Sequence, residues 1–306
     1  MLGIAVVSYN RIEGVKNAIK HIEENTVQPF ELVVADDGSS DQSSSILREL
    51  GYTVVSGRNM GVCWNKNRAL FYLAYVKKCS SIILMEDDTW PVAQGWESDW
   101  IEAIGYYGHI NLAGAWFSQG FVSGSGTPND PFLSSLFSGQ CCGYGAESLS
   151  YVGYLDTRFH GYGSGHVEHT RRFIRAGYGG LYVRNGDRLD LRFLLINSSI
   201  KVTRESTYRN EDQVARNEHL LNEIRDESVY RAPWRTDLEM TQFRSEIRGA
   251  QSEISDLFDE AFYLQSYPDV AGAVSRGECA SGELHYLQHG RHERRLARYV
   301  VRPTIT

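Results

Sequence analysis

Two acidic clusters, each directly after a short apolar run, are the first residues of this chain that could do chemistry. Asp36 and Asp37 open the first cluster, which extends to Asp41 and follows the apolar segment Glu31–Ala35. Carboxylates at the end of a strand can accept hydrogen bonds from ribose hydroxyls or a base N–H, and they repel phosphate. The cluster therefore favours recognition of the nucleoside half of a nucleotide. A turn closed by a Ser or Asp helix cap would have the same composition.

The second acidic cluster is Glu86-Asp87-Asp88, which follows the apolar segment Ser81–Met85. Three consecutive carboxylates repel one another unless a cation lies among them. Hard oxygen ligands suit Mg²⁺ or Mn²⁺, and these ions commonly bridge protein carboxylates and substrate phosphates. A bound ion here would neutralise a departing diphosphate. Taken alone, this cluster could be a solvated acidic turn. Because both acidic clusters follow strands of the same predicted sheet, a shared binding site is favoured.

A third cluster combines a glycine-rich turn with titratable side chains. The turn covers Gly161–Gly165, and a helix is predicted from about His166 to Ala176, with Gly177 as its stop. His166 and Glu168 lie in the first turn of that helix, where an imidazole or a carboxylate could accept a proton. The alternative is an ordinary helix start with solvated charges.

The elements that position these clusters alternate between strands and helices. Strands are predicted at Gly3–Ser8, Glu31–Ala35, Tyr52–Ser56 and Ser81–Met85, and helices at Ile12–Glu24, Ser43–Leu50 and Val62–Lys78. This alternation predicts an α/β fold with a mostly parallel sheet, right-handed connections and helices on both faces. In such a sheet, ligands bind outside the carboxyl ends of the strands, where both acidic clusters would lie.

The whole chain divides into three predicted parts. The large domain covers residues 1–230 and includes a long loop at Ser118–Ser138, a strand near Gly139–Gly145 and a helix within Asn210–Glu227. Residues 231–251 are polar and are expected to be a connector. Residues 252–306 are expected to form a small all-α unit with its own apolar core.

Composition excludes several classes of protein. The chain has 306 residues, 42% of them hydrophobic, and a net charge of −7, which argues against a nucleic-acid-binding protein. The longest apolar runs are far shorter than the roughly 20 residues of a spanning helix, and the N-terminus does not resemble a signal peptide. The five cysteines include no CxxC pair and are expected to be free thiols of a cytoplasmic protein. Most of the tryptophans Trp64, Trp90, Trp96, Trp100 and Trp116 are expected in the core.

The order and spacing of these motifs resemble those of family 2 glycosyltransferases, which have the nucleotide-diphospho-sugar transferase (GT-A) fold. The matching segments are Val6–Arg11, Val33–Asp41, Asn59–Gly61 with Asn65–Asn67, and Leu84–Asp88 with Pro91. The resemblance covers about residues 2–105 and continues more weakly to Val183. It implies the GT-A fold and the transfer of a sugar, with inversion, from a nucleotide-diphospho-sugar, for which a UDP-sugar is expected here.

The resemblance also implies roles for single residues. Ser8, Asn10, Asp36 and Asp37 match positions that bind uridine, and Arg11 is expected to face the nucleotide. The three residues of the second acidic cluster take the place of the DxD-type motif, whose last acidic residue holds the metal. Asp88 is therefore the expected ligand of Mn²⁺ or Mg²⁺, while Glu86 and Asp87 are expected to face the ribose.

Inversion needs a general base that deprotonates the acceptor hydroxyl as it attacks the anomeric carbon. In the family a Glu-Asp pair opens the helix of the third cluster, and its Asp is usually the base. Aligned on Arg175–Tyr178, that pair falls on Gly165 and His166, and Glu168 falls on a later acidic position. The sequence departs from the common pattern here. Glu168 is the expected base, His166 is the second candidate and Asp156 is a third.

The C-terminal residues resemble a short helical module that is appended to bacterial glycosyltransferases, a resemblance that implies no function for it. The matching segments are Phe258–Leu264, Tyr267–Val270, Gly282–Tyr286 and His289–Arg291. On a helix, a basic stripe would form from Arg291, Arg294, Arg295 and Arg298. This stripe predicts contact with an anionic membrane surface or an acidic protein partner.

These observations predict an inverting, metal-dependent glycosyltransferase that acts in the synthesis of a bacterial surface polysaccharide. The acceptor would be a growing glycan, free or lipid-linked, and the enzyme would work in the cytoplasm, with the inner face of the membrane as an alternative site. A non-catalytic module that binds a nucleotide-sugar or a glycan on the same fold is the alternative, because the base position is altered. A nucleotidyltransferase is a second alternative, but Ser8–Arg11 lacks the Gly-rich basic loop that such enzymes usually carry.

Overall fold

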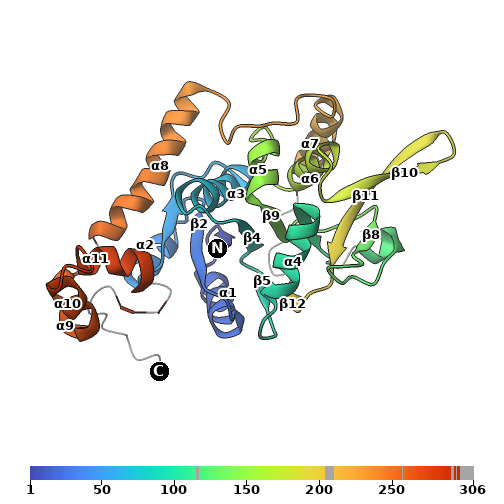
Figure 1. Ribbon diagram of the computed structural model, residues 1–306. Helices are drawn as coiled ribbons and strands as arrows, with labels where there is room; N and C mark the ends of the chain where they lie inside the picture. The colour runs from blue at the N-terminus through green and yellow to red at the C-terminus, as the bar shows by residue number, and fades with distance from the viewer. Residues whose placement is uncertain (115–116, 204–209, 257, 291–292, 294, 297–306) are drawn as a thin grey trace.

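One mixed β-sheet runs through the centre of the molecule, and the computed structural model describes residues 1–114, 117–203, 210–256, 258–290, 293 and 295–296 of the chain (Figure 1). Within these residues the sheet has ten strands. They are β1 (Leu2–Ser8), β2 (Phe30–Asp36), β3 (Val54–Ser56), β4 (Ser81–Glu86), β6 (His109–Leu112), β7 (Phe121–Ser123), β8 (Phe132–Ser134), β9 (Cys141–Gly145), β10 (Gly180–Asn185) and β11 (Arg188–Ile196). A separate two-stranded sheet pairs β5 (Thr89–Pro91) with β12 (Ile200–Val202).

The predicted parallel arrangement holds for the half of the sheet that carries both acidic clusters. Strands β3, β2, β1 and β4 lie side by side in that order, and all three pairings are parallel. Beyond β4 the sheet becomes mixed, because β9 runs antiparallel to both β4 and β6. The register places Ser8 opposite Asp36 and Val7 opposite Glu86. The residues after β1, β2 and β4 therefore meet at one edge of the sheet, as expected.

Helices cover both faces of the sheet, as predicted. Alternating side chains of β1 point to opposite faces, so that Ala5 and Val7 belong to one core while Ile4 and Val6 belong to the other. The first core also includes residues of α3 (Val62–Phe71), α5 (Ala146–Val152), α6 (Gly165–Arg175) and α7 (Glu211–Glu223). The second includes residues of α1 (Ile12–Asn25), α2 (Ser43–Glu49) and α4 (Glu97–Tyr107). A π-helical turn, η1 (Tyr72–Val76), continues α3.

The segment expected to be a long loop, Ser118–Ser138, contains short regular elements instead. It includes most of the 3₁₀ turn η2 (Phe117–Gly120) together with strands β7 and β8. The rings of Phe117 and Phe132 stack with their centroids 4.7 Å apart, so aromatic contact holds this segment against itself. Next to it, the hairpin of β10 and β11 extends away from the body of the molecule (Figure 1).

The C-terminal part differs from the expected connector and module. Helix α8 (Asp237–Asp256) spans most of residues 231–251 and crosses into the predicted module. Its side chains Phe243, Ile247 and Ala250 are buried in the first core. This part of the expected connector therefore packs against the large domain. Figure 1 shows α8 along the side of the molecule opposite the β10–β11 hairpin. The small helical unit follows as α9 (Glu260–Ser266), α10 (Pro268–Ser275), α11 (Gly282–His285) and the π-helical turn η3 (Tyr286–Gly290).

Several expectations from composition can be checked directly. Trp64, Trp90, Trp96 and Trp100 are all buried, as predicted, whereas Trp116 lies outside the described residues. All five cysteines are free thiols. Among the described helices, none is both long enough and apolar enough to cross a membrane.

Candidate active site

The loops that follow β1 and β2 are joined by direct hydrogen bonds. The Asn10 amide N–H donates to Ser39 Oγ over 2.7 Å, and the Ser40 N–H donates to Asn10 Oδ1 over 2.6 Å. Asn10 has a φ of 55°, a conformation that Asn adopts more readily than most residues and that turns its carbonyl side chain toward the second loop. The Ile12 N–H donates to Asp41 Oδ2 over 3.1 Å. This network fixes the two loops that the sequence predicted to bind the nucleoside.

Asp37 is buried and holds the loop that begins α3. Its Oδ1 accepts from the Met60 N–H at 3.0 Å, and its Oδ2 accepts from the Gly61 N–H at 2.9 Å. Nη1 of the fully buried Arg68 also donates to Oδ1 at 3.0 Å. Burial raises the pKa of Asp37 above its ordinary value, although the two amides and Arg68 oppose that rise. Asp37 thus holds the Met60–Gly61 backbone through both of its carboxylate oxygens.

Asp36 is bonded within its own turn. The Ser39 N–H donates to its Oδ2 at 3.1 Å, Ser44 Oγ donates to the same oxygen at 2.7 Å, and Ser39 Oγ donates to Oδ1. Only 1% of Asp36 is exposed. The hydrogen bonds observed for Asp36 are therefore those of a turn-forming residue, the alternative that the sequence left open for this cluster.

The residues of the second acidic cluster have different partners. Glu86 accepts from Nζ of the buried Lys66 at 2.7 Å, and Lys66 also donates to the Gly139 carbonyl at 3.0 Å. Burial acts to lower the pKa of Lys66, but the neighbouring Glu86 carboxylate raises it above its ordinary value overall. Since the Glu86 side chain is still 33% exposed, it faces both the lysine and the outside of the site.

Asp87 joins this cluster to the loop after β1. Ser8 Oγ donates to Asp87 Oδ2 at 2.5 Å, and Arg11 Nη1 lies 3.0 Å from Oδ1. Burial raises the pKa of Asp87 to about 6, against the opposing effects of Ser8 and Arg11. Ser8, Arg11 and Asp87, which the sequence predicted separately as donor-binding residues, are therefore joined by one hydrogen bond and one ion pair.

Asp88 has no ion-pair partner among the residues that the structure describes. Thr89 Oγ1 donates to its Oδ1 at 3.1 Å, and Gln140 Nε2 donates to its Oδ2 at 3.2 Å. Only 5% of Asp88 is exposed, and burial together with the nearby Glu86 carboxylate raises its pKa. A buried carboxylate that has no ion-pair partner in the described part of the chain, and whose two oxygens each accept one hydrogen bond there, fits a hard divalent ion such as Mn²⁺ or Mg²⁺.

His166 lies at the start of α6, close to the second acidic cluster. Its ring meets the Phe137 ring edge-on with the centroids 5.3 Å apart, and a Cβ built on Gly139 would lie 2.4 Å from the imidazole Cγ. The ring is therefore placed by close contact with Gly139, the residue whose carbonyl accepts the hydrogen bond from Lys66. Burial and the Lys66 charge lower the pKa of His166 to about 4, so the imidazole is neutral at pH 7.

Glu168 lies on the same helix but is fully engaged with Arg172. Arg172 Nε donates to Oε1 at 2.7 Å and Nη2 donates to Oε2 at 2.9 Å, and both side chains are almost completely buried. Arg172 also donates to the carbonyls of Val152, Tyr154 and Val229. Glu168 therefore anchors a structural arginine, and this geometry ranks it below His166 as the base, the reverse of the order expected from the sequence.

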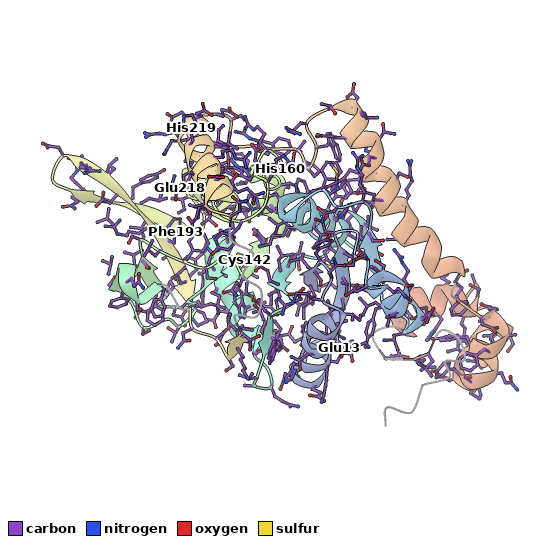
Figure 2. The ribbon with its side chains drawn as sticks, turned by 180° about the vertical axis from the view of Figure 1, so that it is seen from behind. Glu13, Cys142, His160, Phe193, Glu218 and His219 are labelled. Carbon is purple, nitrogen blue, oxygen red and sulfur yellow. The ribbon has the colours of Figure 1, made fainter. Side chains whose placement is uncertain are left out.

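The third candidate base, Asp156, is held in a similar way. Arg158 Nη2 lies 2.6 Å and Arg231 Nε lies 3.1 Å from Asp156 Oδ2. Hydrogen bonds from Arg158 outweigh the effect of burial, so the pKa of Asp156 is lowered. His160, labelled in Figure 2, lies between Asp156 and α6 in the sequence, and a Cβ on Gly61 would lie 3.9 Å from its Nδ1. His160 therefore borders the Asp37 loop, although the sequence analysis did not single it out.

Four further residues of the site were not predicted to have a role in it: Lys66, Arg68, Gln140 and Glu246. Lys66 lies within Asn65–Asn67, one of the segments that carry the family resemblance, but the resemblance assigned no role to its side chain. Arg68 is two residues further along the same helix, and Gln140 directly precedes β9. Glu246 lies on α8, 178 residues from Arg68 along the chain, so no local signal connects the two.

Comparison with a family model covers nearly half of the chain. Residues 3–140 match the model described as glycosyl transferase family 2. The match includes every predicted donor-binding residue and Asp88, and it ends before His166 and Glu168. It confirms the resemblance stated from the sequence. The chain has no significant match among curated protein sequences.

Solved structures share the fold at low sequence identity. The mannosyltransferase PcManGT from Pyrobaculum calidifontis, in complex with GDP-Man and Mn²⁺, has a TM-score of 0.51 and 14% identity, over 89% of this chain and 80% of that one. GalNAc-T7 with UDP, GalNAc and Mn²⁺ has a TM-score of 0.53 and 12% identity, over 81% of this chain and 54% of that one. S. aureus TarS 1–349 with UDP reaches only 0.44, with 15% identity over 64% and 60% of the two chains. The first two confirm the predicted fold.

Proposed function

We propose, on the premise that residues 3–140 form a glycosyltransferase family 2 domain, that this chain is an inverting, metal-dependent enzyme with a nucleotide-diphospho-sugar donor. The observation that carries the proposal is Asp88, a buried carboxylate without an ion-pair partner among the described residues. It lies at the carboxyl end of β4, beside two carboxylates that do have cationic partners.

The residues fit a divalent ion. Asp88, with Glu86 beside it, would hold Mn²⁺ or Mg²⁺, and the ion would neutralise charge on the leaving diphosphate. No group of three or more His, Cys, Asp or Glu side chains suited to a metal occurs in the described part of the chain. This agrees with a site in which one or two carboxylates bind the ion and substrate phosphates complete its coordination.

The loops after β1 and β2 would bind the nucleoside half of the donor. Asn10 and the backbone around Met60 and Gly61 border this position, and Asp37 holds that backbone in place. We propose a UDP-sugar as the donor. GDP-Man in PcManGT and UDP in GalNAc-T7 occur in structures of this fold, so a GDP-sugar is the alternative donor that an assay has to include.

His166 would act as the general base. Its imidazole is neutral at pH 7, has no hydrogen-bond partner among the described residues and lies near Glu86, so it is free to accept the proton of an acceptor hydroxyl. A pKa of about 4 makes it a weak base in the unliganded protein. Bound donor phosphates would add negative charge nearby and raise that pKa toward neutrality.

The acceptor would be a growing glycan, free or lipid-linked, of a bacterial surface polysaccharide. Five free thiols support a place in the reducing cytoplasm.

Contact with the membrane or a protein through the C-terminal unit receives little support from Arg295, which is paired with Asp269 at 2.7 Å. The other three arginines of the expected stripe, Arg291, Arg294 and Arg298, lie outside the described residues. Binding of the full chain to anionic but not to neutral vesicles would test that contact.

A panel of UDP- and GDP-sugars tests the central proposal. We expect Mn²⁺-dependent hydrolysis or transfer for one donor, with the anomeric configuration of the product inverted in its NMR spectrum. His166→Ala should retain nucleotide binding and lose turnover about a hundredfold or more, the usual effect of removing a general base. Nucleotide binding without turnover for every donor and acceptor would support the non-catalytic alternative, which the locked Glu168 side chain favours. No nucleotide binding at all would refute both.

A further inference from the structure

Helix α8 is joined to the back of the donor site by a buried ion pair. Glu246 Oε2 accepts from Arg68 Nε at 3.0 Å and from Trp64 Nε1 at 3.0 Å. Its Oε1 accepts from Gln242 Nε2 at 2.9 Å, so both carboxylate oxygens are used. The Glu246 side chain is 10% exposed and Arg68 is fully buried. A carboxylate from the supposed connector thus neutralises the arginine that contacts Asp37.

Arg68 occupies a fixed position between the two carboxylates. Its Nη1 donates to Asp37 Oδ1 at 3.0 Å and to the Asp36 carbonyl at 3.2 Å, and its Nη2 donates to the Arg58 carbonyl at 2.9 Å. The guanidinium therefore contacts the end of β2, the Asp37 side chain and the loop before α3 at once. Since the guanidinium group is planar and rigid, a displacement of its Nε atom would change all of these contacts.

The surroundings leave the pair little room to move. A Cβ built on Gly57 would lie 2.3 Å from Glu246 Oε1 and 2.7 Å from Arg68 Nη2, so only the absence of a side chain there admits the pair. On α8, Phe243 meets the Trp64 ring edge-on at 5.3 Å and the Phe71 ring at 5.4 Å. This apolar contact fixes the helix, and the helix fixes the carboxylate. Figure 2 shows α8 from behind as one continuous helix beside the sheet.

We propose that Glu246 is a positioning residue for the donor site, which acts through Arg68 on Asp37 and thereby on the Met60–Gly61 backbone. The part that concerns the nucleotide rests on the proposed function. With Glu246 in place, Arg68 shares its charge between two anions. Without it, the buried cation has Asp37 as its remaining carboxylate partner, and the geometry of the loop changes. Helix α8 would in this way set the nucleotide affinity of a site built by the N-terminal half of the chain.

The test compares Glu246→Gln with Glu239→Gln, a matched control on the same helix. Glu239 pairs with Arg235 near the surface and has no contact with the donor site. Amide hydrogen exchange without any ligand is the first measurement. We expect the Met60 and Gly61 amides to exchange about tenfold faster in Glu246→Gln, which is about 1.4 kcal/mol. The amides of β1 should be unchanged, since general destabilisation would affect them as well.

Nucleotide binding is the second measurement. The Kd for UDP or GDP with Mn²⁺, and the donor KM, should rise about tenfold in Glu246→Gln, with kcat changed by less than about threefold. Unchanged exchange at Met60 and Gly61, or equal acceleration across β1, would overturn the inference. If the wild type binds no nucleotide, the proposed function fails while the exchange result still decides the coupling. Should Glu246→Gln not fold, the same exchange criteria apply to Glu246→Asp, which keeps the charge and shortens the side chain.

Discussion

Glu168→Gln separates a structural role from a catalytic role at the start of α6. The substitution keeps the size of the side chain and removes its charge. Arg172, only 2% exposed, then keeps three backbone carbonyl partners but loses Glu168, its anionic partner among the described residues. Breaking a buried ion pair on one side costs about 3–5 kcal/mol, because an uncompensated charge stays in the interior. The glutamine oxygen can still accept one hydrogen bond, so we expect a loss of about 3 kcal/mol in the free energy of unfolding.

Thermal unfolding followed by far-UV circular dichroism measures this loss. For a protein of 306 residues, about 3 kcal/mol corresponds to a decrease in Tm of roughly 5 °C. Below its Tm, the folded Glu168→Gln protein should turn over the donor at close to the wild-type rate. His166→Ala is the matched comparison, because it loses one edge-on ring contact worth about 1 kcal/mol while removing the proposed base.

The opposite pattern would refute this reasoning. If Glu168→Gln unfolds at the wild-type temperature and its kcat falls a hundredfold with donor binding intact, Glu168 is the base. In that case the pair with Arg172 would have to open when substrates bind. A His166→Ala enzyme with unchanged activity would exclude His166 as the base.

Asp88→Asn should lower turnover by at least a hundredfold and abolish the Mn²⁺-dependent increase in Tm caused by nucleotide, without lowering the Tm of the free protein. Chelation of metal with EDTA should have the same effect on the wild type, and Mn²⁺-dependent turnover by Asp88→Asn would disprove the assignment. Acid should destabilise the protein, because burial lowers the pKa of His109 to about 4 from 6.5. The unfolded chain then takes up a proton first, so the free energy of unfolding falls by about 3 kcal/mol as the pH drops from about 6.5 to about 4. Urea titrations at several pH values measure this slope, which should be smaller in His109→Gln; equal slopes would contradict the argument.

Local patterns in the sequence were sufficient to predict that the ends of β1, β2 and β4 lie together. The strand that ends at Ser8 and the strand that ends at Asp36 are apolar runs, and parallel pairing in register brings their ends together. The same holds for the strand that ends at Glu86. The position of the metal-binding candidate could therefore be predicted from the order of strands and helices, because the topology of a parallel sheet leaves one edge for all these residues.

The ranking of the candidate bases was harder to predict, because the partners of a carboxylate decide what it can do. Arg172 follows Glu168 at i+4, a spacing that on a helix favours an ion pair, and this local signal argues for a structural role. The burial of both side chains, which shields the ion pair from water, depends on α5 and on the segment around Val229. Both are far from Glu168 in the sequence. His166 gains its place from Phe137 and Gly139, which no periodicity connects to it.

The sequence by itself determined which residues end the strands of the sheet, since apolar runs and turns are written locally and parallel strands align their carboxyl ends. The tertiary structure alone decided which charges neutralise one another. Arg68 lies between Asp37 and Glu246, residues 31 and 178 positions away from it. Phe243, Ile247 and Ala250 recur at helical spacing and could have indicated an apolar face on α8, but the surface it covers is formed by Trp64 and Phe71. Coulomb interactions and burial act through space, so the charge of a buried group depends on residues that are neighbours only after folding.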